Sequence, residues 1–213
     1  MTVEILELLP TFFPAERKST SDIWGKKLLF SKQDYIKIVA PSGSGKTSFM
    51  HFLYGLRNDY NGEIIIDKKN SRHFNREVFS MLRKNNLAIV LQDLRLFPEQ
   101  TVKENIEIKR QLVPFHPPEK ITAMCERLGI AGKLDSKCRN CSYGEQQRVA
   151  IIRALMQPFD FLLLDEPFSH LDEANAQQAM KLMDEEAKIR GAGIIFADLE
   201  RIDYFPYTRL YHL

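Results

Sequence analysis

The chain has 213 residues, of which 44% are hydrophobic and 27% are charged, and its formal net charge is +2. This length suits one sizeable domain, and the charge gives no electrostatic reason to expect a nucleic-acid partner. No apolar run approaches the roughly 18–20 residues that a membrane-spanning helix needs. The first ten residues, MTVEILELLP, lack a basic segment and carry two glutamates, so we expect no signal peptide.

Short apolar runs alternate with segments of helical periodicity along the chain. The apolar runs lack polar alternation, which is typical of strands that are buried on both faces. We expect strands at 35–40, 63–67, 87–91, 161–164 and 193–197, and edge strands within 1–34 and 207–213. We expect helices at 47–57, 102–111, 118–128, 143–156 and 174–190. This order predicts an α/β domain, and the strand-free stretch 93–140 predicts a helical insertion.

The first predicted strand leads directly into the sequence APSGSGKT at residues 40–47. This sequence fits the phosphate-loop pattern G-x-x-x-x-G-K-[ST], except that Ala40 holds the first glycine position. Its two glycines allow a tight turn in which backbone N–H groups face one anion. Lys46 would reach the β- and γ-phosphates of a nucleotide, and the Thr47 hydroxyl would bind Mg²⁺. The candidate nucleotide-binding residues here are Ser42, Gly43, Ser44, Gly45, Lys46, Thr47 and Ser48.

The predicted strand at 161–164 ends in two carboxylates, Asp165 and Glu166. In parallel α/β sheets, ligands bind outside the carboxyl ends of the strands. Asp165 is therefore a candidate for holding Mg²⁺ through water. Glu166 is the candidate general base for an attacking water, a role that typically contributes about 10²–10⁴-fold in rate. An exposed acidic turn is the alternative, and the phosphate loop upstream argues against it.

Further motifs occur in a fixed order with these two. They are Gln92 at the end of LAIVLQ, LFPEQTVKENI at 96–106, CSYGEQQR at 141–148, FLLLDEP at 161–167 and SHLD at 169–172. Together they resemble the phosphate loop, Q-loop, signature, Walker B and D-loop of the ATP-binding cassette (ABC) family of ATPases. The resemblance covers nearly the whole chain. It implies a P-loop NTPase core with a mostly parallel sheet, an N-terminal antiparallel β portion and an inserted α-helical subdomain.

The resemblance also implies domain limits and partners. One domain would cover 1–213, with its core at 1–92 and 143–213 and the helical signature subdomain at about 93–142. In the family, the signature of one chain completes the nucleotide site of a second chain. Two ATP molecules would therefore lie between two copies, or between this chain and a related ATPase, arranged head to tail about a two-fold axis.

Single residues acquire expected roles from the same resemblance. Gln92 would contact Mg²⁺ and the attacking water, unless it is only a solvated strand end. Phe13, or its neighbour Phe12, would stack on adenine, unless both only pack the core. Asp172 would couple the two nucleotide sites, unless it only caps the helix that follows. If Asp172 only caps that helix, its role would be local and structural.

The signature departs from the usual LSGGQ pattern of the family. Ser142, Gly144 and Glu145 are the candidate contacts to the nucleotide of the partner, and Ser142 would also cap the helix at 143–156. Tyr143 stands where the family usually has glycine. Its bulky side chain must therefore point away from the nucleotide, or the closure of the pair is obstructed.

The family usually carries a histidine near the position of Asp198. A carboxylate facing the γ-phosphate would place negative charge against negative charge in a poorly solvated site. We therefore predict that the switch function is missing or that Asp198 points elsewhere, so that ATP binding and dimerisation persist while hydrolysis is slow. His170 could replace the missing histidine, although its place in the D-loop fits a surface residue better.

A cassette ATPase of this kind works with a separate membrane permease on the cytoplasmic face of the cell membrane. Docking is expected near residues 92–102, with Leu94, Leu96, Phe97 and the helix from Val102 as the candidates. Leu96 and Phe97 could form an exposed apolar patch or simply pack the helical region. The length resembles the small ATPases of lipoprotein export, macrolide-type export and cell-division complexes. The alternative is an ATP-dependent regulatory or mechanical partner of a membrane protein that transports nothing. A DNA-repair ATPase would need a long coiled-coil insertion, which is absent from the sequence.

The three cysteines are Cys125, Cys138 and Cys141. Their low, odd number fits a reducing compartment. The spacing Cys138-x-x-Cys141 is that of half a zinc site or of a redox pair. A structural zinc needs four ligands, and the sequence offers no second pair, so we expect unpaired thiols.

Overall fold

The computed structural model of the chain describes residues 1–199 and 204–213. Its strands are β1 (Thr2–Pro10), β2 (Lys27–Ser31), β3 (Tyr35–Val39), β4 (Tyr60–Ile66), β5 (Lys69–Asn70), β6 (Leu87–Val90), β7 (Phe161–Asp165), β8 (Gly193–Asp198) and β9 (Arg209–His212). Its α-helices are α1 (Lys46–Leu53), α2 (Arg76–Asn85), α3 (Val102–Leu112), α4 (Glu119–Arg127), α5 (Tyr143–Leu155) and α6 (Glu173–Arg190). Short 3-10 helices are η1 (Ala15–Lys18), η2 (Ser71–His73), η3 (Ala131–Lys133) and η4 (Cys138–Asn140).

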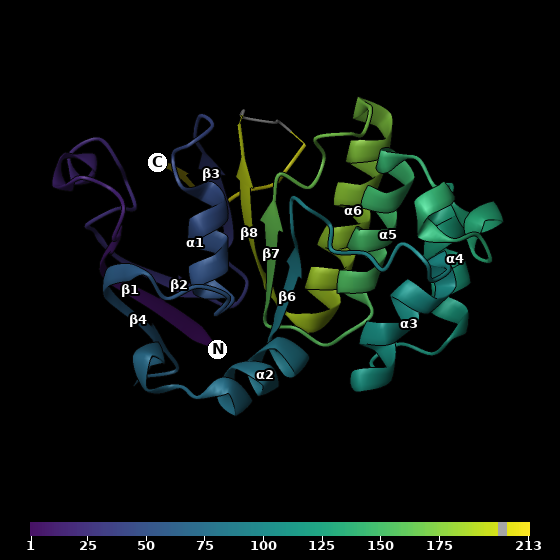
Figure 1. Ribbon diagram of the computed structural model, residues 1–213, viewed down its shortest axis with the longest axis horizontal. Coiled ribbons are helices and arrows are strands. Elements are labelled where there is room, and N and C mark those ends of the chain that lie inside the picture. The colour runs from purple at the N-terminus through teal and green to yellow at the C-terminus, as the bar shows by residue number, and fades with distance from the viewer. Residues whose placement is uncertain (200–203) are drawn as a thin grey trace.

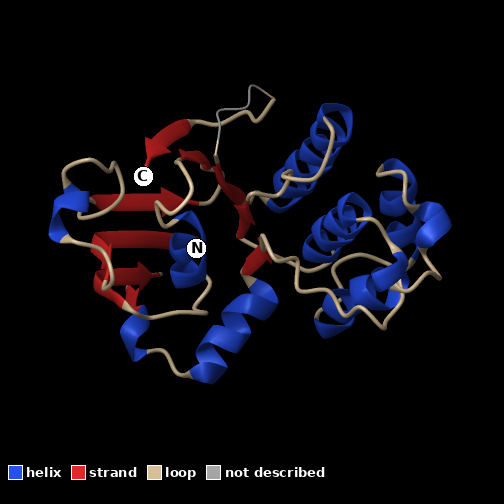
Figure 2. Cartoon of the chain, turned by 45° about the horizontal axis from the view of Figure 1, so that its top comes forward, coloured by secondary structure: helices blue, strands red, loops and turns tan. Residues whose placement is uncertain are grey.

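Two sheets make up one half of the molecule, and α3 to α6 make up the other (Figure 1). Strands β6, β7, β8, β3 and β9 lie side by side in that order, and all their pairings are parallel. Strands β2, β1, β4 and β5 form a second sheet with antiparallel pairings. The expected parallel sheet, the antiparallel N-terminal portion and the C-terminal edge strand are therefore confirmed. The run at 63–67 instead belongs to β4 of the antiparallel sheet, and β1 is paired on both sides rather than being an edge strand. Figure 2 shows the strands gathered in this half and the helices around them.

The parallel sheet is covered on both faces, as the uniformly apolar strand sequences require. In β7, Phe161 and Leu163 pack with α1, β1 and β4, whereas Leu162 and Leu164 pack with α5 and α6. Figure 1 shows α1 on one side of this sheet and α5 and α6 on the other. Because all strands of the sheet run the same way, their carboxyl ends meet at one edge, and the loops after β3, β6, β7 and β8 are brought together there.

The helical insertion packs on α5, which α3 and α4 both contact. Its first helix is fixed by a capping box, in which the Thr101 hydroxyl accepts from the Glu104 N–H and the Glu104 carboxylate accepts from the Thr101 N–H. Between residues 93 and 140, which the structure describes throughout, the only strand-like contact is one bridge between Thr101 and Lys137. The division into a core and a subdomain at 93 and 142 remains a prediction. Within the described part of the chain, no helix is long and apolar enough to cross a membrane.

Two of the α-helices differ clearly from the sequence prediction. Helix α1 ends at Leu53 rather than at 57, because Gly55 takes a left-handed conformation (φ 69°) that terminates the helix. Helix α2 was not predicted at all. Its start is marked by Asn75, whose side chain accepts from the Val78 N–H at 2.9 Å. Asparagine before an acidic first turn, here Glu77, is a sequence signal for a helix start and could have identified it.

Candidate functional site

The phosphate loop turns sharply between β3 and α1. Gly43 (φ 77°) and Gly45 (φ 99°) adopt left-handed conformations, which favour glycine. A Cβ on Gly45 would lie 2.9 Å from the Trp24 ring and 3.0 Å from the Phe13 ring, so this position has no room for a side chain. Helix α1 begins directly after it at Lys46. The loop therefore has the backbone geometry of an anion cradle.

Three motifs that are far apart in the sequence meet at this loop. The Lys46 ammonium donates to the Ala40 carbonyl at 2.8 Å and lies 3.1 Å from a Glu166 carboxylate oxygen. The Thr47 hydroxyl donates to Gln92 Oε1 at 3.4 Å, and Gln92 Nε2 donates to Glu166 Oε2 at 3.2 Å. Glu166 is thus held between a lysine of the phosphate loop and the glutamine that follows β6.

The backbone of Glu166 is left-handed (φ 48°), which is uncommon for a residue other than glycine. Its N–H donates to the Ala197 carbonyl on β8 at 2.9 Å. Such strained positions persist only where the surrounding structure fixes them, and they cluster at functional sites. The strain turns the Glu166 side chain from the end of β7 towards the loop.

A cavity of about 460 Å³ lies over the loop. Its lining includes Phe12, Phe13, Gln92, Glu166 and Leu199, together with all the candidate loop residues except Ser44. Phe12 is 51% exposed, and Phe13 stands edge-on to Trp24 at 6.1 Å. Both rings line the cavity, and the half-buried Phe13 also packs against the core, as its alternative role predicted. Their stacking on adenine remains a prediction.

Ser44 and Trp24 form the inner wall of the loop. Ser44 is 1% exposed, and the Trp24 indole N–H donates to its carbonyl at 3.2 Å. Among the described residues, the Ser44 hydroxyl has no hydrogen-bond partner. Trp24, the only tryptophan of the chain, was not among the predicted site residues, because nothing in its local sequence places it beside the loop.

Asp165 ends β7 one residue before Glu166, is completely buried and does not line the cavity. Within the described part of the chain, neither of its carboxylate oxygens has a hydrogen-bond partner, and burial raises its pKa to about 6. Buried polar atoms are normally paired, so these two bare oxygens suit a cation. With the Thr47 hydroxyl and the Gln92 amide oxygen they offer the hard oxygen donors that Mg²⁺ prefers. The residues present therefore fit the magnesium ion that the sequence predicts.

Ser142 begins α5 with a complete capping box. Its hydroxyl accepts from the Glu145 N–H at 3.2 Å, and the Glu145 carboxylate accepts from the Ser142 N–H at 2.7 Å. Lys133 also lies 3.4 Å from this carboxylate. The predicted cap is therefore confirmed, and Glu145 is engaged in it. Ser142, Gly144, Glu145 and Asp172 do not line the cavity over the phosphate loop, and their contacts to a nucleotide remain predictions.

Tyr143 joins the signature to the other two loops of its own chain. Its hydroxyl donates to the Gln92 carbonyl at 3.3 Å, and its ring lies 4.1 Å from the His170 ring, centroid to centroid. Gly144 must be small here, because a Cβ would lie 2.8 Å from the His170 carbonyl oxygen. The side chain of Tyr143 therefore lies against the D-loop and Q-loop of its own chain.

Gln147 on α5 is a connecting residue that sequence reasoning missed. It is 1% exposed, donates to the Glu166 carbonyl at 3.3 Å and accepts from the His170 N–H at 3.1 Å. A polar residue one helical turn after Tyr143, on the buried face of α5, was the available signal. Asp172 caps α6 by accepting from the Asn175 N–H at 2.9 Å, which was one of its two predicted roles.

Asp198 ends β8 and is held by a residue that the sequence did not single out. Lys37 on β3 is completely buried, and its ammonium lies 3.4 Å from Asp198 Oδ2. The other carboxylate oxygen accepts from the Leu199 N–H at 2.8 Å. Both oxygens of Asp198 are thus engaged, and its negative charge is paired. His170 bonds to its neighbour Ser169 at 2.9 Å and does not line the cavity.

The segment at 92–102 is only partly apolar at its surface. Leu94 is 3% exposed and Leu96 packs against the core, whereas Phe97 is 52% exposed. Leu94 therefore cannot form part of an exposed patch, which corrects its place among the predicted docking residues. All three cysteines are buried free thiols. Within the described ranges, no group of three or more histidine, cysteine or acidic side chains is arranged to hold a metal.

The chain was compared with known proteins. The family model described as ABC transporter matches residues 26–169. The lipoprotein-releasing system ATP-binding protein LolD of Legionella pneumophila (strain Lens) is 37% identical over 182 residues, which cover 84% of this chain and 80% of LolD. The macrolide export ATP-binding/permease protein MacB of Nitrosomonas europaea is 34% identical, with 75% of this chain but only 24% of MacB covered.

A solved structure of the same architecture is the dimeric bacterial ABC transporter cassette MJ0796. It superposes with a TM-score of 0.84 at 22% identity and covers 99% of this chain and 94% of the cassette chain. This likeness confirms the fold. The family model spans more than half of the chain, and LolD exceeds 30% identity over most of it. The chain therefore belongs to the ABC transporter family, as one of its ATP-binding proteins.

Proposed function

We propose that the protein hydrolyses ATP with Mg²⁺ as one half of a pair of chains, and that this cycle drives a separate membrane permease. The observation that carries the proposal is the position of Glu166. Its carboxylate lies between Lys46 and Gln92, and Glu166 directly follows Asp165, whose carboxylate oxygens are bare. A base, a phosphate-binding cation and a magnesium ligand thus converge at one cavity, which is the arrangement that phosphoryl transfer to water requires.

Each residue of this cavity has a chemical role in the proposal. Lys46 leaves Glu166 and binds the β- and γ-phosphates, which frees the Glu166 carboxylate to accept a proton from the attacking water. Gln92 orients that water, and Asp165 with Thr47 holds the metal. When bound, Mg²⁺ neutralises charge on the phosphate oxygens. The low exposure of Lys46 and Asp165 strengthens these electrostatic interactions.

The pairing of two chains follows from residues that lie outside the cavity. Ser142 and Gly144 stand at the N-terminus of α5, where hydroxyl and N–H groups favour an anion. They do not line the cavity of their own chain. A second copy, or a related ATPase, would bring its bound γ-phosphate to this helix start. Tyr143 then links the start of α5 to the Gln92 loop, so that closure of the pair would move that loop.

The same loop is the proposed docking site of the permease. Phe97 is exposed within 92–102, and Arg153 of α5 donates to the Arg95 carbonyl at 2.8 Å. A cytoplasmic segment of the permease on Phe97 would therefore move with the signature helix. In this proposal the protein works at the cytoplasmic face of the membrane.

Size-exclusion chromatography of Glu166→Gln tests the pairing. With ATP and Mg²⁺ this variant should elute as a dimer, because the nucleotide binds but its hydrolysis is stopped. With ADP, or with Lys46→Ala added, it should elute as a monomer. Steady ATP hydrolysis by Glu166→Gln, or a monomer under all conditions, would contradict the proposal.

Co-purification tests the docking site. Phe97→Glu should abolish recovery of the protein with a co-expressed membrane permease. Ile189→Glu is the matched control, because Ile189 is 63% exposed on α6 and lies outside the proposed site. Equal recovery of both variants would place the permease elsewhere.

The second candidate function is ATP-dependent regulation of a membrane protein without transport. The pairing of Asp198 with Lys37 favours it, because Asp198 stands where the family's histidine would contact the γ-phosphate. Reconstituted vesicles separate the two functions. ATP-dependent movement of a substrate supports transport, whereas ATP-dependent control of the membrane protein without such movement supports regulation.

A further inference from the structure

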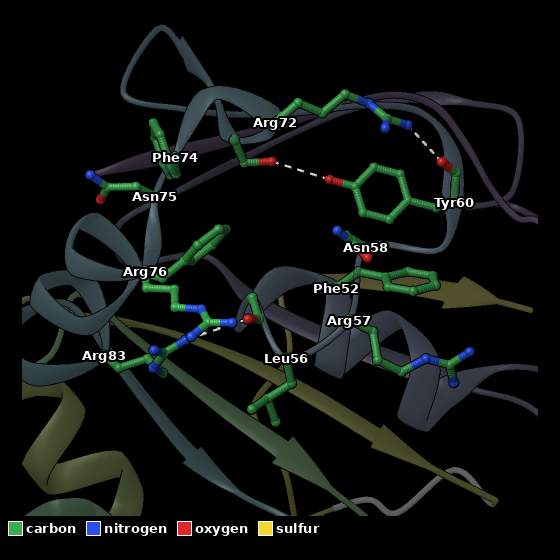
Figure 3. A pocket seen from close by; sticks show the side chains of 13 residues that line it. Phe52, Leu56, Arg57, Asn58, Tyr60, Arg72, Phe74, Asn75, Arg76 and Arg83 are labelled. Carbon is green, nitrogen blue, oxygen red and sulfur yellow. Dashed lines mark hydrogen bonds between the residues drawn. The ribbon is translucent and has the colours of Figure 1, made fainter.

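A second cavity, of about 500 Å³, lies at the far end of α1 and shares no lining residue with the cavity over the phosphate loop (Figure 3). It is enclosed by the residues that follow α1, by η2 and by the first two turns of α2. Four arginines line it, namely Arg57, Arg72, Arg76 and Arg83, and its lining contains no carboxylate. Its size is within the range of small-molecule sites.

Among the described residues, no carboxylate neutralises three of the four guanidinium charges. Arg57 is the exception, because its Nε donates to Asp59 at 2.9 Å. Arg72 donates to the Tyr60 carbonyl at 2.6 Å, and Arg83 donates to the Gly55 carbonyl at 3.4 Å. Backbone carbonyls satisfy a donor but carry no net charge.

Among the described residues, Arg76 is the one arginine of the four whose side chain has no partner. In the part of the chain that the structure describes, no hydrogen bond, ion pair or ring contact engages it. Figure 3 shows its guanidinium and that of Arg83 at the same side of the cavity, with Arg72 across from them. Like charges gathered in this way repel one another, and an anion between them would remove the repulsion.

The spacing of the residues on α2 explains how two arginines reach one ligand. Arg76, Phe79 and Arg83 follow the pattern i, i+3, i+7 and therefore share one face of the helix. Seven residues correspond to a rise of about 10 Å, which two long arginine side chains can span. Phe79 packs against Gly55, where a Cβ would lie 2.2 Å from its ring. This close contact fixes α2 to the end of α1.

The remaining walls are largely aromatic. Phe52, Tyr60, Phe74 and Phe79 line the cavity, and the Tyr60 hydroxyl bonds to Ser71 Oγ at 3.2 Å. Arginine suits phosphate better than lysine does, because its planar fork can donate two hydrogen bonds to one phosphate group. Aromatic walls suit the apolar or planar body to which such a group is attached.

We propose that this cavity is a second ligand site of the protein, which binds a phosphate-bearing molecule with its anionic group between Arg76 and Arg83. The ligand can come from two sources, a soluble phosphate compound or the headgroup of an anionic lipid, which share this chemistry. The proposal does not depend on ATP hydrolysis or on pairing of the chains, so its failure would leave the proposed function intact.

Calorimetry with inorganic pyrophosphate tests the site directly. The phosphate loop also binds such anions, so the titration uses Lys46→Ala. One binding event should remain, and Arg76→Gln or Arg83→Gln should weaken it at least tenfold. Arg76 is exposed and unpaired, so its replacement leaves the fold intact. Lys84→Gln is the matched control, because it removes one positive charge from α2 without touching the cavity lining.

In the unmodified protein, Trp24 fluorescence distinguishes binding at the two anion sites, because the Trp24 indole donates a hydrogen bond to the phosphate loop. Pyrophosphate binding at the arginine cavity should leave the Trp24 fluorescence unchanged. Binding that follows the Trp24 signal alone and is unaffected by Arg76→Gln would overturn the proposal.

Vesicles distinguish the sources of the ligand. Phosphatidylcholine vesicles with and without 20% phosphatidic acid are sedimented with the protein. Arg76-dependent binding to the phosphatidic acid vesicles, displaced by pyrophosphate, assigns a lipid headgroup. Pyrophosphate binding without vesicle binding assigns a soluble ligand. If neither probe binds, or if only an acidic peptide binds, the phosphate site is refuted.

Discussion

The ammonium of Lys37 lies 3.4 Å from Asp198 Oδ2 and 3.6 Å from the centroid of the Phe196 ring. Lys37 and Phe196 are paired across β3 and β8, and Asp198 follows two residues later on the same face of the sheet. Burial lowers the pKa of Lys37 to about 8, and Asp198 opposes that fall. The carboxylate is therefore the counter-ion of a buried lysine.

Asp198→Asn should destabilise the protein, because it leaves the Lys37 ammonium buried without a counter-charge. The expected loss is about 3 kcal/mol of unfolding free energy, the lower end for a buried pair because Asp198 is partly exposed, and Lys37→Met together with Asp198→Asn should restore most of it. Urea unfolding of the two single variants and the double variant gives the coupling between them. A coupling energy below about 0.5 kcal/mol, which means that the two single effects simply add, would show that the pair is not coupled.

Turnover should be slow in the unmodified protein and faster when a histidine replaces Asp198. Asp198→His alone would leave Lys37 buried without its counter-charge. The variant to measure is therefore Lys37→Met with Asp198→His, assayed with the membrane partner present. We expect an increase of about 100-fold, the lower end of the range for a positioned acid–base group. Lys37→Met alone is the control. Unmodified turnover within the usual range of about 1–10³ s⁻¹, unchanged by the histidine, would refute this explanation.

Asp165→Asn should stabilise the protein while it abolishes magnesium-dependent hydrolysis. The buried, unpaired carboxylate has its pKa raised to about 6 by burial, so at neutral pH its charge opposes folding. Removal of that charge should raise the unfolding free energy by up to about 3 kcal/mol in metal-free buffer. Thermal unfolding at pH 7.5 measures the gain. A lower stability of Asp165→Asn would mean that the carboxylate has a partner in the folded protein.

Ser142 has two expected roles, and two substitutions separate them. Ser142→Ala removes the cap of α5 and should cost about 1 kcal/mol of stability. Ser142→Asp keeps a capping oxygen but adds a negative charge, which should repel the γ-phosphate of the partner. We therefore expect Ser142→Asp to retain its stability and to lose the ATP-dependent dimer of Glu166→Gln. A dimer that survives Ser142→Asp would show that this helix start does not face phosphate.

The lowered pKa of Glu186 predicts how the stability of the protein depends on pH. Burial alone would raise its pKa, but hydrogen bonds from His116 and Arg190 outweigh burial and bring the pKa to about 2. Its stabilising effect is therefore complete above the unfolded pKa of about 4.3 and is lost as the pH falls towards 2. The loss should reach about 3 kcal/mol. Urea unfolding from pH 6 to 2.5 should show this slope in the unmodified protein but not in Glu186→Gln.

An exposed glutamate supplies the control for that measurement. Glu77 lies on the surface of α2, and Glu77→Gln should keep the acid-dependent loss of stability. If Glu186→Gln also keeps it, the ion pairs with Arg190 and His116 do not determine the acid stability.

Much of the fold was predictable, because it depends on local patterns. The apolar runs that became β3, β6, β7 and β8 carry no polar alternation, and burial on both faces leaves no other pattern for them. The phosphate loop was equally readable, since its glycines and its lysine are fixed by the backbone geometry of a strand that turns into a helix. Helix α2 was missed although two sequence signals marked it, Asn75 at its start and the apolar residues Val78, Phe79 and Leu82 at helical spacing.

The sequence by itself determined the order of the motifs, the chemistry of Lys46, Asp165 and Glu166, and the cap at Ser142. Each of these depends on neighbours within a few residues. Only the tertiary structure decided that Lys37 pairs with Asp198, 161 positions away, and that the arginines of α2 meet those that follow α1. These contacts arise because parallel strands and packed helices bring distant segments together, and spacing along the chain carries no record of which side chains then meet.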